Sequence, residues 1–70
     1  MKLLGTVKQT MKHKLVVSAT QLPRLGKEVF DEKERPIGTT VDYIGQTKEP
    51  LVVVSTKHPV KNFVGKKLYI

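Results

Sequence analysis

The stretch from Ile37 to Val54 reads I-G-T-T-V-D-Y-I-G-Q-T-K-E-P-L-V-V-V, and it decides the fold of this chain. Two apolar, β-prone runs at 37–44 and 51–54 flank a polar connection, which is the pattern of two strands joined by a turn. The second run is continuously apolar, as is typical of a strand covered on both faces. Gly45 can adopt a positive φ, and Pro50 has no N–H to donate to a ladder, so both ends of the connection are restrained.

Alternation in the first run assigns its side chains to the two faces of a strand. Successive side chains of a strand point to opposite sides. One face is predicted to hold Ile37, Thr39, Val41 and Tyr43, and the other Gly38, Thr40, Asp42 and Ile44. A glycine inside a strand is typical of a bulge or of close approach by another backbone. The stretch therefore predicts a shaped surface and not a reaction centre.

Short β-prone segments separated by turn signals extend this pattern over the whole chain. The predicted strands are 3–9, 14–19, 28–31, 37–44, 51–55 and 66–70. No segment shows helical periodicity longer than one turn. Six short strands at spacings near ten residues predict one all-β domain, residues 1–70, folded as a small six-stranded closed β-barrel, because closure removes the sheet edges. The pattern alone does not separate this barrel from an SH3-like or OB-type barrel.

Composition describes a small domain without covalent reinforcement. The chain has 70 residues and no cysteine, so neither a disulfide nor a thiolate metal site supplements its core. A chain of this size buries only about 60% of its unfolded surface. No apolar run approaches the roughly 18 residues that span a bilayer, and the apolar start of the chain is interrupted at Gly5. We therefore expect a soluble, intracellular protein.

The formal net charge of +7 is unevenly distributed along the chain. Residues 1–27 and 50–70 contain basic but no acidic residues, and all six acidic residues lie between them. If the terminal strands pair, one side of the barrel is basic, and such a side attracts nucleic acid through counterion release. Lysine-rich surfaces are also common in small proteins without any nucleic-acid partner. The lysines expected near RNA are Lys8, Lys12, Lys14, Lys66 and Lys67.

Candidate catalytic and metal-ligating residues lack the neighbours that such chemistry needs. His13 and His58 are the only histidines, and neither has a second ligand at metal-binding spacing. Asp42 lies on a predicted strand and Glu49 in a loop, with no nucleophile nearby, so a paired-carboxylate role is not indicated. We expect a protein that is not an enzyme, with no catalytic residue, no metal site and no cofactor.

Four motifs in the chain occur in a characteristic order. They are L-G-T-V at 4–7, L-P-R-L-G-K-E-V-F-D at 22–31, the stretch at 37–54, and V-G-K-K-L-Y-I at 64–70. In this order they resemble the Gar/Naf family, the small β-barrel subunits of H/ACA ribonucleoproteins. The family pattern I-G-x-V-x-D-V-F-G-P-V followed by P-Y-x-x-V is matched here at Ile37, Gly38, Asp42, Gly45, Pro50 and Val54. The chain departs from it at Ile44, Gln46, Thr47 and Leu51.

The resemblance implies a barrel of the translation-factor and reductase type, and a role in an archaeal, cytoplasmic ribonucleoprotein. Family members dock on a dyskerin-type pseudouridine synthase, which carries the chemistry, and influence RNA substrate loading and product release through its mobile loop. Guide RNA and ribosomal RNA are implied partners within the complex. The residues expected at or beside the docking surface are Ile44, Gly45, Pro50, Leu51 and Val52.

Three alternatives stay open on sequence grounds. A free-standing RNA-binding barrel associated with the ribosome or with translation would use the basic ends for strong, salt-sensitive RNA affinity. An assembly factor of the Naf type shares the barrel but usually carries long extensions. A small enzyme has little support, because no catalytic constellation is present.

Overall fold

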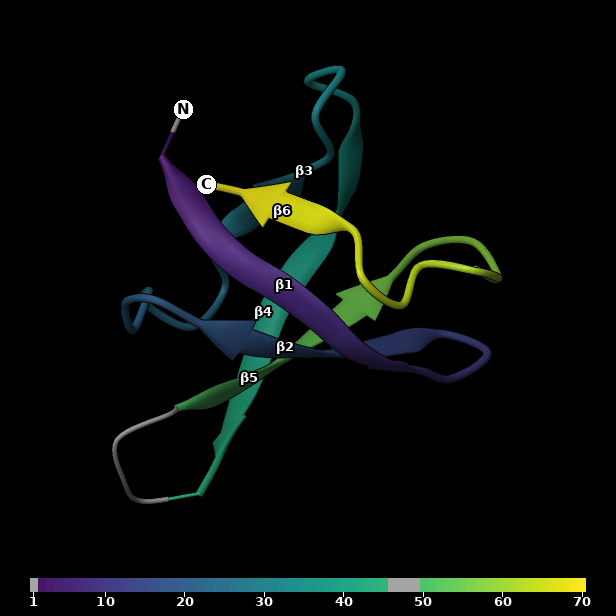
Figure 1. The fold of residues 1–70 in the computed structure, drawn as a ribbon. Coiled ribbons are helices and arrows are strands. Elements are labelled where there is room, and N and C mark those ends of the chain that lie inside the picture. Colours follow the sequence, from purple (N-terminus) through teal and green to yellow (C-terminus); the bar gives the residue numbers. More distant parts are fainter. Residues whose placement is uncertain (1, 46–49) are drawn as a thin grey trace.

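Six strands follow one another along the chain in the computed structural model, which describes residues 2–45 and 50–70. They are β1 (Leu3–Thr10), β2 (Lys14–Ala19), β3 (Glu28–Phe30), β4 (Pro36–Ile44), β5 (Leu51–Thr56) and β6 (Lys67–Tyr69). All neighbouring strands are antiparallel, and the order β1-β2-β5-β4-β3-β6 closes on itself as a barrel (Figure 1). The predicted six-stranded barrel is confirmed. Residue 31, predicted to end the third strand, lies instead in the turn before β4.

The short strand β6 closes the barrel by pairing with both β1 and β3. Tyr69 pairs with Leu3 on one side and with Phe30 on the other. Beyond these strands, Lys2 and Ile70 exchange two backbone hydrogen bonds of 2.8 Å each. The two ends of the described chain therefore lie side by side (Figure 1). The terminal strands β1 and β6 thus pair, which was the condition for a basic side of the barrel.

The core fills the barrel interior with aliphatic side chains taken from alternate strand positions. Full burial of one such side chain stabilises the fold by about 1.5–3 kcal/mol. The members of the core are Leu4, Val7, Leu15, Val17, Ala19, Val29, Val52, Val54 and Leu68. Every strand contributes except β4, whose inward positions at its first half are Gly38 and Thr40. The core is small, so each of its contacts is a large share of the total stability.

Two backbones approach closely at Gly38. A Cβ built on this residue would overlap the carbonyl oxygen of Ser55 and lie 2.8 Å from its carbonyl carbon. Both atoms belong to the backbone of β5, so neither can move aside cheaply. The strand glycine that the sequence marked is therefore required by close approach and not by a positive φ.

A buried hydroxyl group on β4 forms hydrogen bonds with the loop between β2 and β3. Thr40 is 1% exposed, and its Oγ1 donates to the carbonyl oxygen of Arg24 at 2.6 Å and accepts from the backbone N–H of Lys27 at 3.0 Å. Three residues further along β4, the Tyr43 hydroxyl donates to the carbonyl oxygen of Pro23. These bonds hold the loop over one end of the barrel. Among the residues described, none forms a helix long and apolar enough to cross a membrane.

Candidate protein-docking surface

A β-bulge in the middle of β4 decides which side chains this strand presents. Thr40 pairs with Val54, whereas Asp42 pairs with Val53, so Val41 is an extra residue without a partner of its own. A bulge of this kind puts two residues opposite one and changes the face on which later residues lie. The predicted alternation therefore holds as far as Thr40 and is wrong beyond it.

The bulge moves Ile44 to the outside of the barrel. Past the bulge, Tyr43 pairs with the inward-facing Val52 and Ile44 pairs with Leu51. Directly paired residues of an antiparallel ladder share a face. Ile44 thus stands beside Leu51 on the outer surface, and not on the face of Gly38 and Thr40 as the unbroken alternation predicts.

The outer surface of β2, β5 and β4 carries a group of apolar side chains, which we call the β4–β5 face, and the exposed Asp42 shares this surface as the pairing partner of Val53. Ile44 is 46% exposed, Val41 is 42% exposed and Leu51 is half-buried. Val16 and Val53 pair with each other, are almost fully covered, and do not belong to the interior core cluster. A partner that covered this face would therefore extend the apolar surface layer that Val16 and Val53 form in the free chain.

The five predicted docking residues are only partly brought together. Ile44 and Leu51 lie side by side, Gly45 follows with a φ of 85°, and Pro50 accepts a 2.9 Å hydrogen bond from the backbone N–H of Ala19. Val52, in contrast, is fully buried in the interior and offers no side chain to a partner. Val52 can therefore lie only beside such a surface, because its position on β5 faces the core. Gln46, Thr47 and Glu49 lie outside the described residues.

Sequence reasoning missed Val16, Val41 and Val53. The run at 51–54 is apolar without interruption, so it carries no signal for which valine faces outward. The expectation that both faces of this run are covered is confirmed, since the inward Val52 and Val54 are fully buried and the outer Val53 is only 7% exposed. At Val41 the bulge has no glycine to mark it.

The predicted RNA-proximal lysines are all exposed but fall into two groups. Lys12 and Lys14 lie at the turn between β1 and β2, next to the loop that precedes β6. Lys66 and Lys67 lie at the start of β6, where Thr6 of β1 pairs with Lys67. Lys8 sits at an irregularity in the ladder between β1 and β2.

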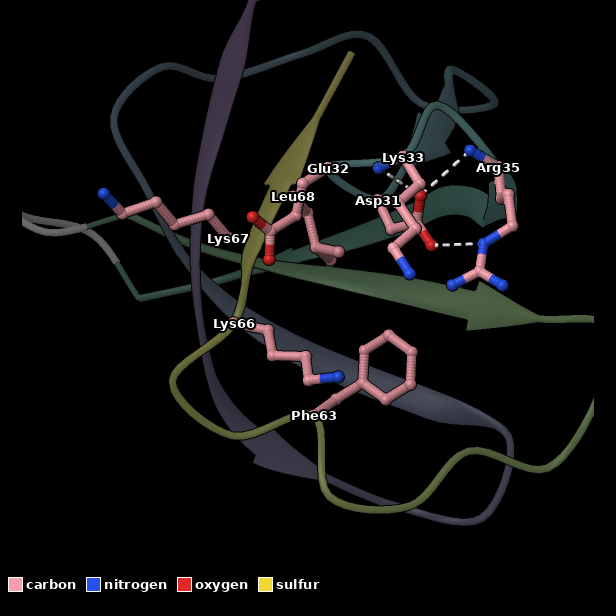
Figure 2. Close-up of a pocket in the computed structure, with 8 residues that line it drawn as sticks. All are labelled: Asp31, Glu32, Lys33, Arg35, Phe63, Lys66, Lys67 and Leu68. Carbon is pink, nitrogen blue, oxygen red and sulfur yellow. Dashed lines mark hydrogen bonds and ion pairs between the residues drawn. The ribbon is translucent and has the colours of Figure 1, made fainter.

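A small pocket lies between the turn before β4 and the start of β6 (Figure 2). Its volume is about 120 Å³, which is small beside the ≈300–1,000 Å³ of ordinary ligand sites. Figure 2 shows the Lys66 side chain reaching along Phe63, with its Nζ 5.2 Å from the ring centre. The residues that line the pocket are Asp31, Glu32, Lys33, Arg35, Phe63, Lys66, Lys67 and Leu68. The pocket is too small for a nucleotide.

Two of the charged side chains at this pocket, Asp31 and Arg35, form an ion pair. Asp31 accepts hydrogen bonds from the backbone N–H groups of Lys33 and Arg35 at 2.8 and 2.9 Å, and from Nε of Arg35 at 3.0 Å. Burial raises the pKa of Asp31, but these bonds and the Arg35 charge outweigh it and lower that pKa below its ordinary value of 3.8. The carboxylate closes the turn between β3 and β4.

Replacing Asp31 with asparagine is expected to lower stability at pH 7 and to have a smaller effect at acid pH. Because the folded-state pKa is depressed, the charged carboxylate stabilises the fold fully above the ordinary pKa of 3.8. That contribution is lost as the pH falls through the folded-state pKa. Urea unfolding of both proteins at pH 7 and at roughly pH 2.5 measures the difference. An equal difference at the two pH values would contradict an ionic role for Asp31.

Metal ligands do not gather in the part of the chain that the structure describes. No group of three or more histidine, cysteine or acidic side chains is placed there to hold a metal ion. No protein-family model matches the chain, and no curated protein matches it in sequence. The site with the clearest chemistry is therefore the β4–β5 face, which suits contact with an apolar protein surface.

Proposed function

We propose that this chain is a non-catalytic subunit of an H/ACA ribonucleoprotein and docks through its β4–β5 face on a dyskerin-type pseudouridine synthase. The observation that carries the proposal is the outward-facing pair formed by the exposed Ile44 and the half-buried Leu51. Both belong to the stretch that resembles the Gar/Naf motif, and the six-stranded barrel agrees with the fold that the resemblance implies. In this role the chain supports guide-RNA-directed pseudouridylation of ribosomal RNA by aiding substrate loading and product release.

Docking on a partner suits a domain of this size. A standard protein interface covers about 800 Å² on each side, which is roughly one sixth of the 4837 Å² surface of this chain. Apolar anchors at the centre of an interface supply most of its binding energy. Ile44 and Leu51 are the anchors, and Val41 extends the contact across the bulge. Val16 and Val53 lie beside them on the same outer surface.

The two described residues next to the anchors, Gly45 and Pro50, have restrained backbones. Gly45 holds a φ of 85°, which side-chain-bearing residues rarely adopt, and Pro50 begins the return of the chain with a fixed φ of its own. A surface that needs little reordering loses little conformational entropy on binding. This supports a lasting contact between subunits in preference to a brief encounter.

Calorimetric titration of the chain against the dyskerin-type synthase of the same organism tests the proposal. We expect tight binding that changes little between about 0.15 and 0.5 M salt, because apolar contacts are not screened by ions. Guide RNA alone should bind weakly and lose affinity steeply over the same range. No binding to the synthase, together with tight and salt-sensitive RNA binding, would replace the proposal with the free-standing RNA-binding barrel.

A further inference from the structure

Backbone hydrogen bonds join the β1–β2 turn to the end of β5 and the loop that follows it, at one end of the barrel. The backbone N–H of Thr56 donates to the carbonyl oxygen of His13 at 2.8 Å, and that of Val60 donates to the carbonyl oxygen of Lys12 at 3.1 Å. Figure 1 shows both segments projecting from the same side of the barrel. Residues more than forty positions apart in the chain therefore share one surface, which we call the basic end.

The basic end brings together two segments that are rich in lysine. Neither 11–14 nor 57–62 contains an acidic residue. The ion pair that the structure records among the described residues joins Arg35 to Asp31, and no residue of the basic end takes part in it. The exposed cationic side chains here are Lys12, Lys14, Lys57 and Lys61. Holding four like charges together weakens a fold, so the arrangement favours an anionic ligand with several charges.

We propose that the basic end binds the phosphate backbone of RNA. Its cations are lysines, which bind phosphates as point charges. Both arginines of the chain, Arg24 and Arg35, lie outside these loops. Backbone contacts of this kind carry no sequence preference. The ligand is therefore any RNA strand that runs past these loops.

The basic end and the β4–β5 face can be occupied at the same time. Leu51 begins β5 and Lys57 follows its last residue, Thr56. Six residues of extended strand span about 20 Å. A protein seated on Leu51 and Ile44 thus leaves the lysines free for RNA. This second site goes beyond the docking role and needs no synthase.

The test is fluorescence anisotropy of a labelled 20-nucleotide single-stranded RNA titrated with the full chain at several salt concentrations. The site variant carries Lys12→Gln, Lys57→Gln and Lys61→Gln. A matched control carries Lys2→Gln, Lys27→Gln and Lys33→Gln, which removes the same charge elsewhere on the exposed surface. Circular dichroism of each variant checks the fold.

Four lysine–phosphate contacts predict a slope of log K against log salt near −3, since each contributes about 0.7 for a single strand. The site variant should bind at least about tenfold more weakly at low salt, with a slope near −1. The control should keep a slope near −3. Equal losses in both variants, no RNA binding by the unmodified chain at about 50 mM salt, or equal competition by polyglutamate would each overturn the proposal. None of these outcomes depends on synthase binding.

Discussion

Replacing Ile44 and Leu51 together with alanine is expected to weaken binding to a dyskerin-type synthase by about 100-fold, or about 3 kcal/mol. The two side chains form a directly paired unit on the outer surface, and each loses three carbons in the change. Truncation of central apolar anchors commonly costs more than 1 kcal/mol apiece. The loss should appear mainly in the dissociation rate, because apolar contacts contribute little to long-range attraction.

A matched control exists elsewhere on the same chain. Leu22 and Leu25 are 61% and 55% exposed in the loop between β2 and β3, and their change to alanine removes the same number of carbons. This control should bind the synthase as the unmodified chain does. Calorimetry measures both affinities, and urea unfolding shows whether each variant stays folded. Unchanged affinity in the Ile44→Ala, Leu51→Ala protein would remove the β4–β5 face as the docking site, and a loss confined to the control would move docking to the loop.

Gly38→Ala is expected to be among the most destabilising single changes outside the aliphatic core, together with Gly5→Ala, where a Cβ would overlap the carbonyl oxygen of Ser18 in the same way. At Gly38 the added methyl group would overlap the backbone carbonyl of Ser55, and it would also lie 3.0 Å from the Cα of Thr56. Relief would require β4 and β5 to separate, which would disturb the ladder behind the β4–β5 face. Overpacking usually costs about 1–3 kcal/mol, and a clash with backbone belongs at or above the top of that range. The total free energy of unfolding of a domain of this length is roughly 4–10 kcal/mol.

Gly65→Ala is the matching control for this prediction. Gly65 has a φ of 87°, but a Cβ built on it meets nothing within 4 Å. Its replacement should therefore cost only about 1 kcal/mol of backbone strain. Thermal and urea unfolding compare the two variants with the unmodified chain. Similar losses at Gly38 and Gly65 would mean that close approach of the strands is not what requires glycine at position 38.

Much of the architecture could be predicted because its signals are local. Alternation, β-branched runs and turn residues lie within a few positions of one another, and they placed all six strands within about one residue of their observed bounds. The third strand differs at Asp31, whose hydrogen bonds with Lys33 and Arg35 turn the chain before pairing can continue. Ile44 and Leu51 could be predicted as docking residues from their positions in the motif. Their direct pairing between β4 and β5 could not be predicted.

The amino-acid sequence by itself determined that this chain forms six short strands, that Gly38 and Gly45 have special positions, and that its positive charge lies at its two ends. Only the tertiary structure decided which valine of β5 faces outward, that the bulge at Val41 carries Ile44 to the outer surface, and that Lys12 lies beside the loop containing Lys61. The physical reason is that the pairing register of the strands sets the face on which each side chain lies. A one-residue slip in pairing reverses the face of every later side chain, and pairing is set by contacts between distant segments.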